Sequence, residues 1–278
     1  MKKVLVYCCV GSAEHVTYLL NDENIEIIGY SDSNPEIWGK HLFGGVVYPP
    51  SEIPNLDFDL VIISISEYAE EIRNNLINKY GVKEQQIVVF QDTDKGIKFE
   101  DERIAMLRKC IAILKERNVK GNMAEVGVYT GEFSKLFNKY FPDKKLYLFD
   151  TFEGFDNHRD QVNDCDLDKF KDTTVDIVLN KMVKPENCII RKGYFPDTVE
   201  NLEDTFCLVS LDADLYNPIL AGLEYFYPRM EKGGYIFVHD FGSYHFEDVK
   251  EAVYKFCNES GATIVPLLDR GLSVVIAK

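Results

Sequence analysis

The 278-residue chain lacks the features expected of a membrane-spanning or nucleic-acid-binding protein. No apolar run approaches the ~18 residues of a membrane-spanning helix. The apolar start at residues 4–10 runs into polar residues without a small-residue cleavage pattern, so we expect a first strand there and not a signal peptide. Basic residues are few, since 31 lysines and arginines stand against 46 aspartates and glutamates, a net charge of −15. This balance argues against nucleic acid or an anionic membrane surface as the main partner.

A Cys-x-x-Cys motif is also absent. The seven cysteines are odd in number, and most of them lie in apolar runs, where cysteine behaves as a small hydrophobic residue. This usage indicates a reducing compartment, and we therefore expect a cytoplasmic protein.

Short apolar runs alternate with helical patterns along the whole chain. In the first part, strands are expected at 4–10, 25–30, 59–64 and 86–90, with helices at 13–20 and 68–80. A polar segment at 91–96 and a helix over 102–117 lead to a second series, which ends in a strand pair at 263–267 and 272–277. Such alternation specifies parallel sheets with helices on their faces. We predict an α/β protein with two Rossmann-like domains, residues 1–92 and residues 100–278.

The glycine loop of the first domain is degraded. Only Gly11 remains, while Cys9 and Glu14 stand where a dinucleotide-binding loop would carry glycines. The domain resembles the small Rossmann modules of bacterial polysaccharide-modifying enzymes. We expect scaffolding or acceptor recognition from it, with nucleotide binding as the alternative.

Carboxylates and an imidazole follow two neighbouring strands of the second domain. Asp212 and Asp214 come after the apolar run 206–210, and His239 and Asp240 come after 235–237. In an open parallel sheet, ligands bind beyond the carboxyl ends of the strands. Such a cluster is costly unless a cation or a catalytic task requires it. The sequence therefore predicts a metal or catalytic site at this edge.

A possible cofactor loop spans residues 125–131, between a strand and a helix. Gly127 and Gly131 allow close backbone approach, and Asp150, nineteen residues after Gly131, ends the next strand and suits a ribose diol. A carboxylate at Glu125 and a side chain at Tyr129, in place of the middle glycine, argue against a pyrophosphate. S-adenosylmethionine, a sulfonium with an amino-acid tail, fits this pattern.

Four ordered motifs, at 125–131, 149–155, 211–216 and 233–240, resemble those of the macrocin O-methyltransferase family over about residues 100–278. The resemblance implies a class I methyltransferase fold with a seven-stranded, mostly parallel sheet. It also implies an S-adenosylmethionine- and Mg²⁺-dependent enzyme that methylates sugar hydroxyls, and it makes a homo-oligomer an expectation.

The family pattern assigns roles to individual residues. It implies cofactor contacts by Glu125, Gly127, Tyr129, Gly131, Asp150, Thr151, Phe152, Gly193, Tyr194 and Asp212, with Phe195 as an alternative to Tyr194 beside the adenine. It also implies metal binding by Asp212 and Asp240.

One residue departs from the family pattern, because His239 stands where the first of two adjacent aspartates is usual. Either His239 is a metal ligand, which favours a softer ion than Mg²⁺, or it is a base or substrate contact. Asp214 and His239 are the candidates for the catalytic proton acceptor. Asp214 could instead cap the following helix, and His239 could be a buried histidine bonded to the backbone. The acid-rich segment 156–174 is either a lid or a solvated loop.

Taken together, these residues predict metal-assisted transfer of a methyl group from S-adenosylmethionine to a sugar hydroxyl of a glycosylated metabolite or polysaccharide precursor. The ion would be Mg²⁺ or another divalent metal. The alternative is a nucleotide- or sugar-nucleotide-binding enzyme or scaffold that uses the first domain and carries a vestigial methyltransferase site.

Overall fold

The computed structural model describes residues 1–8, 11–20, 23–65, 68–90, 100–155, 169–243 and 247–278. They form two compact units, Met1–Lys109 and Cys110–Lys278, and the division falls inside helix α3 (Glu102–Glu116). The predicted linker at 91–96 lies outside the described residues. None of the helices that the structure describes combines the length and apolar character needed to cross a membrane.

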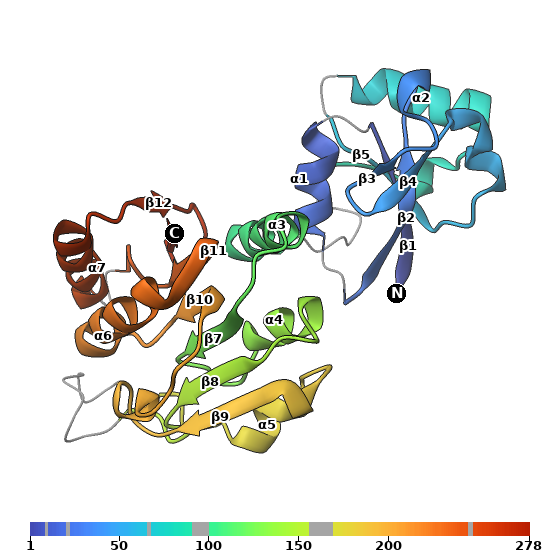
Figure 1. Ribbon diagram of the computed structural model, residues 1–278. Coiled ribbons are helices and arrows are strands. Elements are labelled where there is room, and N and C mark those ends of the chain that lie inside the picture. The colour runs from blue at the N-terminus through green and yellow to red at the C-terminus, as the bar shows by residue number, and fades with distance from the viewer. Residues whose placement is uncertain (9–10, 21–22, 66–67, 91–99, 156–168, 244–246) are drawn as a thin grey trace. The chain divides into compact units, whose positions relative to one another are not determined.

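The first unit contains a six-stranded sheet in the order β3-β4-β2-β1-β5-β6, parallel except for β3 (Figure 1). Its strands are β1 (Lys2–Tyr7), β2 (Ile25–Ser31), β3 (His41–Leu42), β4 (Gly45–Tyr48), β5 (Leu60–Ile63) and β6 (Ile87–Val89), and its helices α1 (Gly11–Leu19) and α2 (Ala69–Tyr80). The hairpin of β3 and β4 was not predicted, because strands of two and four residues give no readable alternation.

The second unit contains a seven-stranded sheet in the order β12-β13-β11-β10-β7-β8-β9. Its strands are β7 (Asn122–Val126), β8 (Leu146–Asp150), β9 (Cys188–Lys192), β10 (Phe206–Leu211), β11 (Met230–Val238), β12 (Ile264–Pro266) and β13 (Val274–Ala277). Strand β13 runs in the opposite direction to the other six strands, and so pairs antiparallel with β11 and β12. This arrangement confirms the predicted seven-stranded, mostly parallel sheet.

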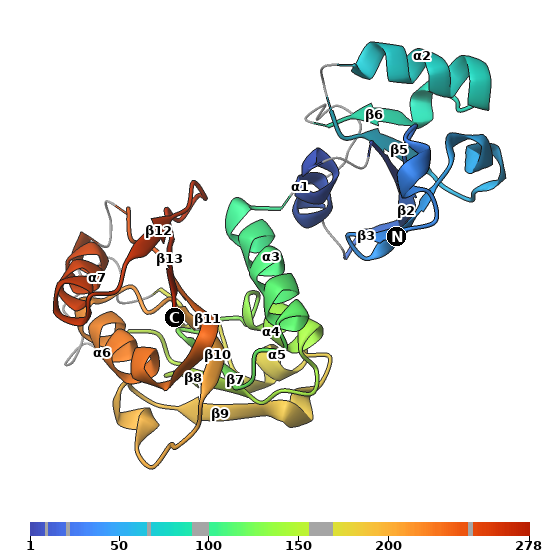
Figure 2. The same cartoon turned by 45° about the horizontal axis from the view of Figure 1, so that its top comes forward.

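Helices cover both faces of this sheet. Helices α6 (Tyr216–Phe226) and α7 (Glu247–Ser260) lie side by side on one face, and α4 (Ser134–Tyr140) and α5 (Val175–Leu179) lie on the other (Figure 2). Short 3₁₀ helices lie at Pro35–Ile37, Pro50–Asn55, Glu84–Gln86, Pro185–Asn187, Asp197–Val199 and Tyr227–Arg229.

Strand β11 begins five residues earlier than the predicted start at 235. The reason is the glycine pair Gly233-Gly234, which has the composition of a turn but here forms part of the strand. A Cβ at Gly234 would lie 2.9 Å from the carbonyl oxygen of Cys207, so the neighbouring strand passes very close. The pairing of β10 with β11 is irregular at this point, as is typical of glycines at a bulge.

An aromatic cluster fixes the strands that lead to the candidate site. The Phe226 ring of α6 lies 4.9 Å from the ring centre of Phe206 on β10 and 5.9 Å from that of Phe149 on β8. Phe195 stacks on Phe226 at 6.1 Å and is only 5% exposed. Phe195 is therefore a core residue, which leaves Tyr194 as the candidate adenine contact from this segment.

Candidate functional site

Backbone hydrogen bonds continue across the carboxyl edge of the second sheet just beyond the strands. These N–H···O=C bonds run from Gly193 to Asp150, from Gly127 to Phe149, from Asp212 to Val126 and from His239 to Leu211, at 2.9, 2.9, 2.8 and 3.0 Å. The chain positions that follow β9, β7, β10 and β11 are thus held in register at one edge. The predicted site residues from these strands converge because the strands are parallel and aligned.

Several residues at this edge adopt the left-handed backbone conformation without being glycine. The φ angles are +49° at Tyr129, +54° at Phe152, +59° at Asp214 and +57° at Asp240. Each such backbone conformation costs about 1–3 kcal/mol of folding free energy, and it persists only where the surrounding structure holds it in place. All four lie in the turns that leave β7, β8, β10 and β11, so the strain is concentrated where the side chains of the candidate site are aimed.

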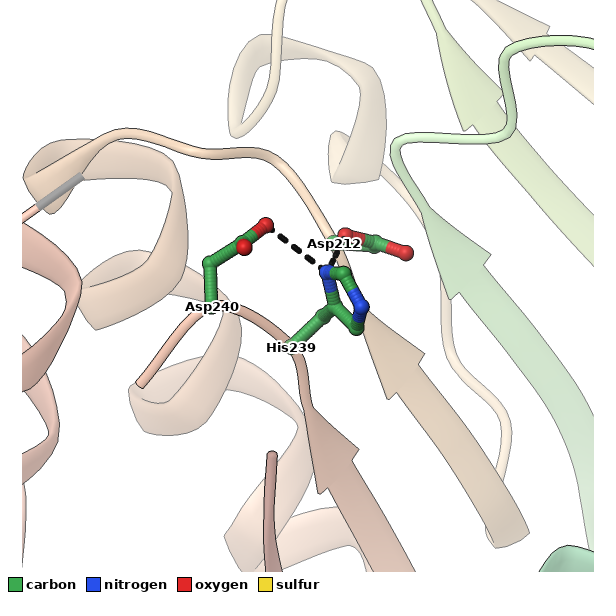
Figure 3. Close-up of side chains that lie close together, drawn as sticks. All are labelled: Asp212, His239 and Asp240. Atoms are coloured by element: carbon green, nitrogen blue, oxygen red, sulfur yellow. Dashed lines mark hydrogen bonds and ion pairs between the residues drawn. The ribbon is translucent and has the colours of Figure 1, made fainter. Parts of the chain in front are cut away.

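An imidazole and two carboxylates form the centre of the site (Figure 3). Nδ1 of His239 lies 3.0 Å from Oδ1 of Asp212 and 2.7 Å from Oδ2 of Asp240. The three ligand atoms lie within 4.8 Å of one another, and all three residues are partly exposed. Two carboxylates with an imidazole are a donor set that suits a divalent metal ion.

Asp214 belongs to the same cluster through a hydrogen bond with Asp240. Burial, followed by the negative charges of Asp212 and Asp240, raises the pKa of the Asp214 carboxyl well above its ordinary value, while His239 acts in the opposite direction. The N-cap of α6 is Leu215, so Asp214 does not take the capping position that was the alternative for it.

The cofactor loop is packed directly against this cluster. Gly127 has a φ of +81°, and a Cβ at this position would overlap the carbonyl oxygen of Asp212. Only glycine supplies both the backbone conformation and the close approach. The two motifs read separately in the sequence, 125–131 and 211–216, therefore meet at a backbone contact.

The Asp150 carboxylate is engaged by the same loop. Its Oδ2 accepts the N–H groups of Val128 and Tyr129 at 2.7 and 2.8 Å, and its Oδ1 accepts the N–H of Phe152 at 2.6 Å. A carboxylate offers about four acceptor positions, so one remains on Oδ1 for a ligand hydroxyl. Asp150 thus shapes the loop and keeps one acceptor position on Oδ1.

Glu125 lies beneath the loop and not on the open edge. It is 1% exposed, and the hydroxyl of Ser134, itself fully buried at the start of α4, donates a hydrogen bond to it. Ser134 was not among the predicted site residues. Its place three residues after Gly131, at the start of a helix, is the signal that could have identified it. The pair connects β7 to α4 under the two glycines.

Tyr129 connects the loop to the described end of the acid-rich segment. Its hydroxyl donates to Oδ1 of Asp172 at 2.9 Å, and its ring meets Phe170 edge-on at 5.2 Å. The hydroxyl of Thr173 donates to the Tyr129 carbonyl. Residues 170–173 were not assigned individually from the sequence. The rest of the predicted lid, 156–168, lies outside the described residues.

Three further predicted contacts lie on the neighbouring turns. The hydroxyl of Thr151 donates to the Gly154 carbonyl at 2.9 Å and accepts the N–H of Glu153, so it is used within its own turn. Gly193, with a φ of +140°, and the partly buried Tyr194 follow β9 directly.

Comparison with known proteins relates both halves of the chain to described families. Residues 98–268 match the family model described as Macrocin-O-methyltransferase (TylF), and residues 1–88 match one described as C2185-like, N-terminal. The chain is 25% identical over 193 residues to demethyldecarbamoylnovobiocin O-methyltransferase of Streptomyces niveus, covering 63% of this chain and 69% of that protein. It is 23% identical over 180 residues to mycinamicin III 3''-O-methyltransferase of Micromonospora griseorubida, covering 58% and 69%.

The fold has a counterpart among solved structures. The O-methyltransferase NovP superposes with a TM-score of 0.55 at 20% identity, covering 64% of this chain and 79% of that one. This similarity confirms the predicted class I methyltransferase architecture for the second unit.

Proposed function

Since the chain belongs to the macrocin O-methyltransferase family and is an S-adenosylmethionine-dependent O-methyltransferase, we propose that it methylates a sugar hydroxyl of a small-molecule acceptor with the assistance of a divalent metal ion. The observation that carries this proposal is the contact between Gly127 and Asp212, because it sets the cofactor loop directly beside the imidazole–carboxylate cluster. Support for the acceptor class comes from family membership and from the two relatives named for O-methylation of demethyldecarbamoylnovobiocin and of mycinamicin III.

The proposed cofactor contacts follow the edge of the sheet. Gly127 and Gly131 would border the methionine end through their backbone, since the space beside them is taken by Asp212 and by Val178, and the remaining acceptor position of Asp150 Oδ1 receives a ribose hydroxyl. Tyr194, which is partly exposed, would border the adenosine, whereas the ring of Phe152 is 5% exposed and is buried like that of Phe195. Glu125 acts from below the loop by holding Ser134, and so contributes to the shape of the loop.

The cluster fits a divalent ion, and Asp212, Asp240 and His239 would hold it. Such an ion supplies positive charge that stabilises an alcohol as it loses its proton. S-adenosylmethionine would supply the methyl group from its sulfonium sulfur, and the products would be S-adenosylhomocysteine and a methyl ether of the acceptor. The hydroxyl proton passes to a carboxylate, for which Asp214 is our candidate.

The alternative, a nucleotide-binding enzyme or scaffold that relies on residues 1–92, is not favoured by the comparisons, because the methyltransferase family model covers residues 98–268. Acceptor recognition or scaffolding remains our prediction for that first part of the chain.

A turnover assay tests the proposal. The purified chain is incubated with S-adenosylmethionine and a panel of sugar nucleotides and glycosides, and methylated products are identified by mass spectrometry. We expect methylation of at least one sugar hydroxyl that is lost in EDTA and in Asp212→Asn, and retained in Asp143→Asn, a change at an exposed acid of the same unit. Turnover that persists in EDTA would remove the metal from the mechanism, and exclusive methylation of non-sugar acceptors would contradict the acceptor class.

A further inference from the structure

We infer that His239 binds the metal ion through Nδ1, and that this nitrogen shifts the preference of the centre from Mg²⁺ toward a transition ion of the Fe²⁺–Zn²⁺ series. The inference rests on the proposed function, which places a divalent ion at this edge of the sheet. It concerns the residue at which the chain departs from the family pattern.

The three ligand atoms have the spacing of ligands around one ion. Two ligands held at right angles about 2.1 Å from one ion lie about 3.0 Å apart. Nδ1 of His239 is 3.0 Å from Oδ1 of Asp212 and 2.7 Å from Oδ2 of Asp240. A neutral ring carries at most one proton on Nδ1, so one N–H would have to be shared between two carboxylates. A metal ion satisfies all three atoms together.

The other ring nitrogen of His239, Nε2, lies against the chain. A Cβ at Gly271, in the turn between β12 and β13, would overlap Nε2 of His239 and would lie 2.6 Å from Cδ2 and from Cε1. The outer edge of the ring therefore packs against the main chain of Gly271. Nε2 is covered from this side, whereas Nδ1 faces the carboxylates. The ligand role is thus favoured over a base that reaches the acceptor through Nε2.

The turn that holds the ring is itself fixed. Asp269, 3% exposed, accepts the backbone N–H of Ser273 at 2.7 Å and its hydroxyl at 2.6 Å. The N–H of Gly242 donates to the carbonyl of Leu272 at 3.1 Å, which ties the turn to the segment that follows His239. Gly271 and Asp269 are therefore positioning residues for the imidazole.

The ligand type decides which ion the centre prefers. Mg²⁺ prefers oxygen ligands, and imidazole suits Fe²⁺, Ni²⁺, Cu²⁺ and Zn²⁺. Any carboxylate site binds Co²⁺ more tightly than lighter divalent ions, so the absolute preference is not diagnostic. The diagnostic quantity is the change in preference when the nitrogen ligand is replaced by the aspartate that the family usually carries at this position.

The experiment compares the wild-type chain with His239→Asp by calorimetric titration with Co²⁺ and with Mg²⁺. We expect the ratio of the Mg²⁺ to the Co²⁺ dissociation constant to fall at least tenfold in His239→Asp. It should not change in His41→Asp, which alters an exposed histidine of β3. An unchanged ratio in His239→Asp overturns the inference.

A spectroscopic measurement identifies the ligand atom. With Mn²⁺ bound, pulsed electron paramagnetic resonance should detect ¹⁴N coupling from an imidazole in the wild type and none in His239→Asp. Bound Mn²⁺ without ¹⁴N coupling in the wild type overturns the inference and leaves the metal-assisted function standing. A wild-type chain that binds none of the three ions overturns both.

A positioning test uses Gly271→Ala, for which we expect weaker Co²⁺ binding and a loss of ¹⁴N coupling. The control is Gly261→Ala, where a Cβ meets nothing within 4 Å and the φ of +73° makes backbone strain the only cost; it should leave the coupling unchanged. Unchanged coupling in a folded Gly271→Ala protein would contradict the positioning role. If that protein does not fold, the His239→Asp comparison decides the inference alone.

Discussion

Replacing Asp150 by asparagine isolates the charge and the second acceptor oxygen of the residue that shapes the cofactor loop. The carboxylate accepts three backbone N–H groups, from Val128, Tyr129 and Phe152, at 2.6–2.8 Å. Asparagine has the same shape but a single acceptor oxygen. Whichever way the amide is turned, at least one backbone N–H faces an NH₂ group, and the remaining hydrogen bonds lose their charge assistance.

The magnitude follows from these three contacts. A hydrogen bond to a charged group contributes about 1.5–3 kcal/mol and a neutral one about 0.5–1.5 kcal/mol. Because Asp150 is partly exposed, water replaces part of what is lost, and we expect a net destabilisation of about 2 kcal/mol. For a unit of this size that lowers the midpoint of thermal unfolding by about 4–8 °C.

Two assays check this expectation, thermal unfolding without ligand and calorimetric titration with S-adenosylhomocysteine. We expect the lowered midpoint together with at least a tenfold loss of affinity, because the loop relaxes and the ribose acceptor is weakened. Asp143→Asn is the matched control and should behave as the wild type. An Asp150→Asn protein with wild-type stability and wild-type affinity would refute the reasoning.

Three other substitutions give separate outcomes. Gly127→Ala should impair S-adenosylhomocysteine and Co²⁺ binding together, because a Cβ would overlap the Asp212 carbonyl oxygen; normal calorimetric titrations with both ligands would count against this contact. Asp212→Asn should retain S-adenosylhomocysteine binding while metal-dependent turnover is lost, and full turnover would exclude Asp212 as a ligand. Phe226→Ala removes a ring that packs on Phe206 and Phe149 and should cost about 3–5 kcal/mol in urea unfolding. A loss below about 1 kcal/mol would contradict that packing role.

The sequence predicts which residues lie at the carboxyl edge of the sheet better than it predicts the contacts that their side chains make there. Asp150, Asp212 and His239 could be assigned to one edge because each follows an apolar run and the carboxyl ends of parallel strands share an edge. The early start of β11 could not be predicted, because Gly233 and Gly234 have turn composition, and the reason for Gly234 is the close approach of Cys207 on the neighbouring strand β10.

Contacts between distant segments account for what the sequence could not provide. His239 and Gly271 are separated by 32 residues, and they meet because β13 returns antiparallel beside β11. The carboxylate of Glu125 is a side chain of the type that binds ligands. In the structure it is buried, and the buried Ser134 of α4 donates a hydrogen bond to it. Periodicity identifies the elements, whereas the direction of these side chains depends on how the elements cross.

Nuclear magnetic resonance of cofactor carrying a ¹³C-labelled methyl group tests whether S-adenosylmethionine binds beside the imidazole–carboxylate cluster. Bound Mn²⁺ broadens nearby resonances through its unpaired electrons. We expect strong broadening of the methyl signal when Mn²⁺ is added to the wild-type complex, and none in Asp212→Asn with cofactor bound. An unbroadened methyl signal in a wild-type chain that holds both cofactor and Mn²⁺ would contradict the account.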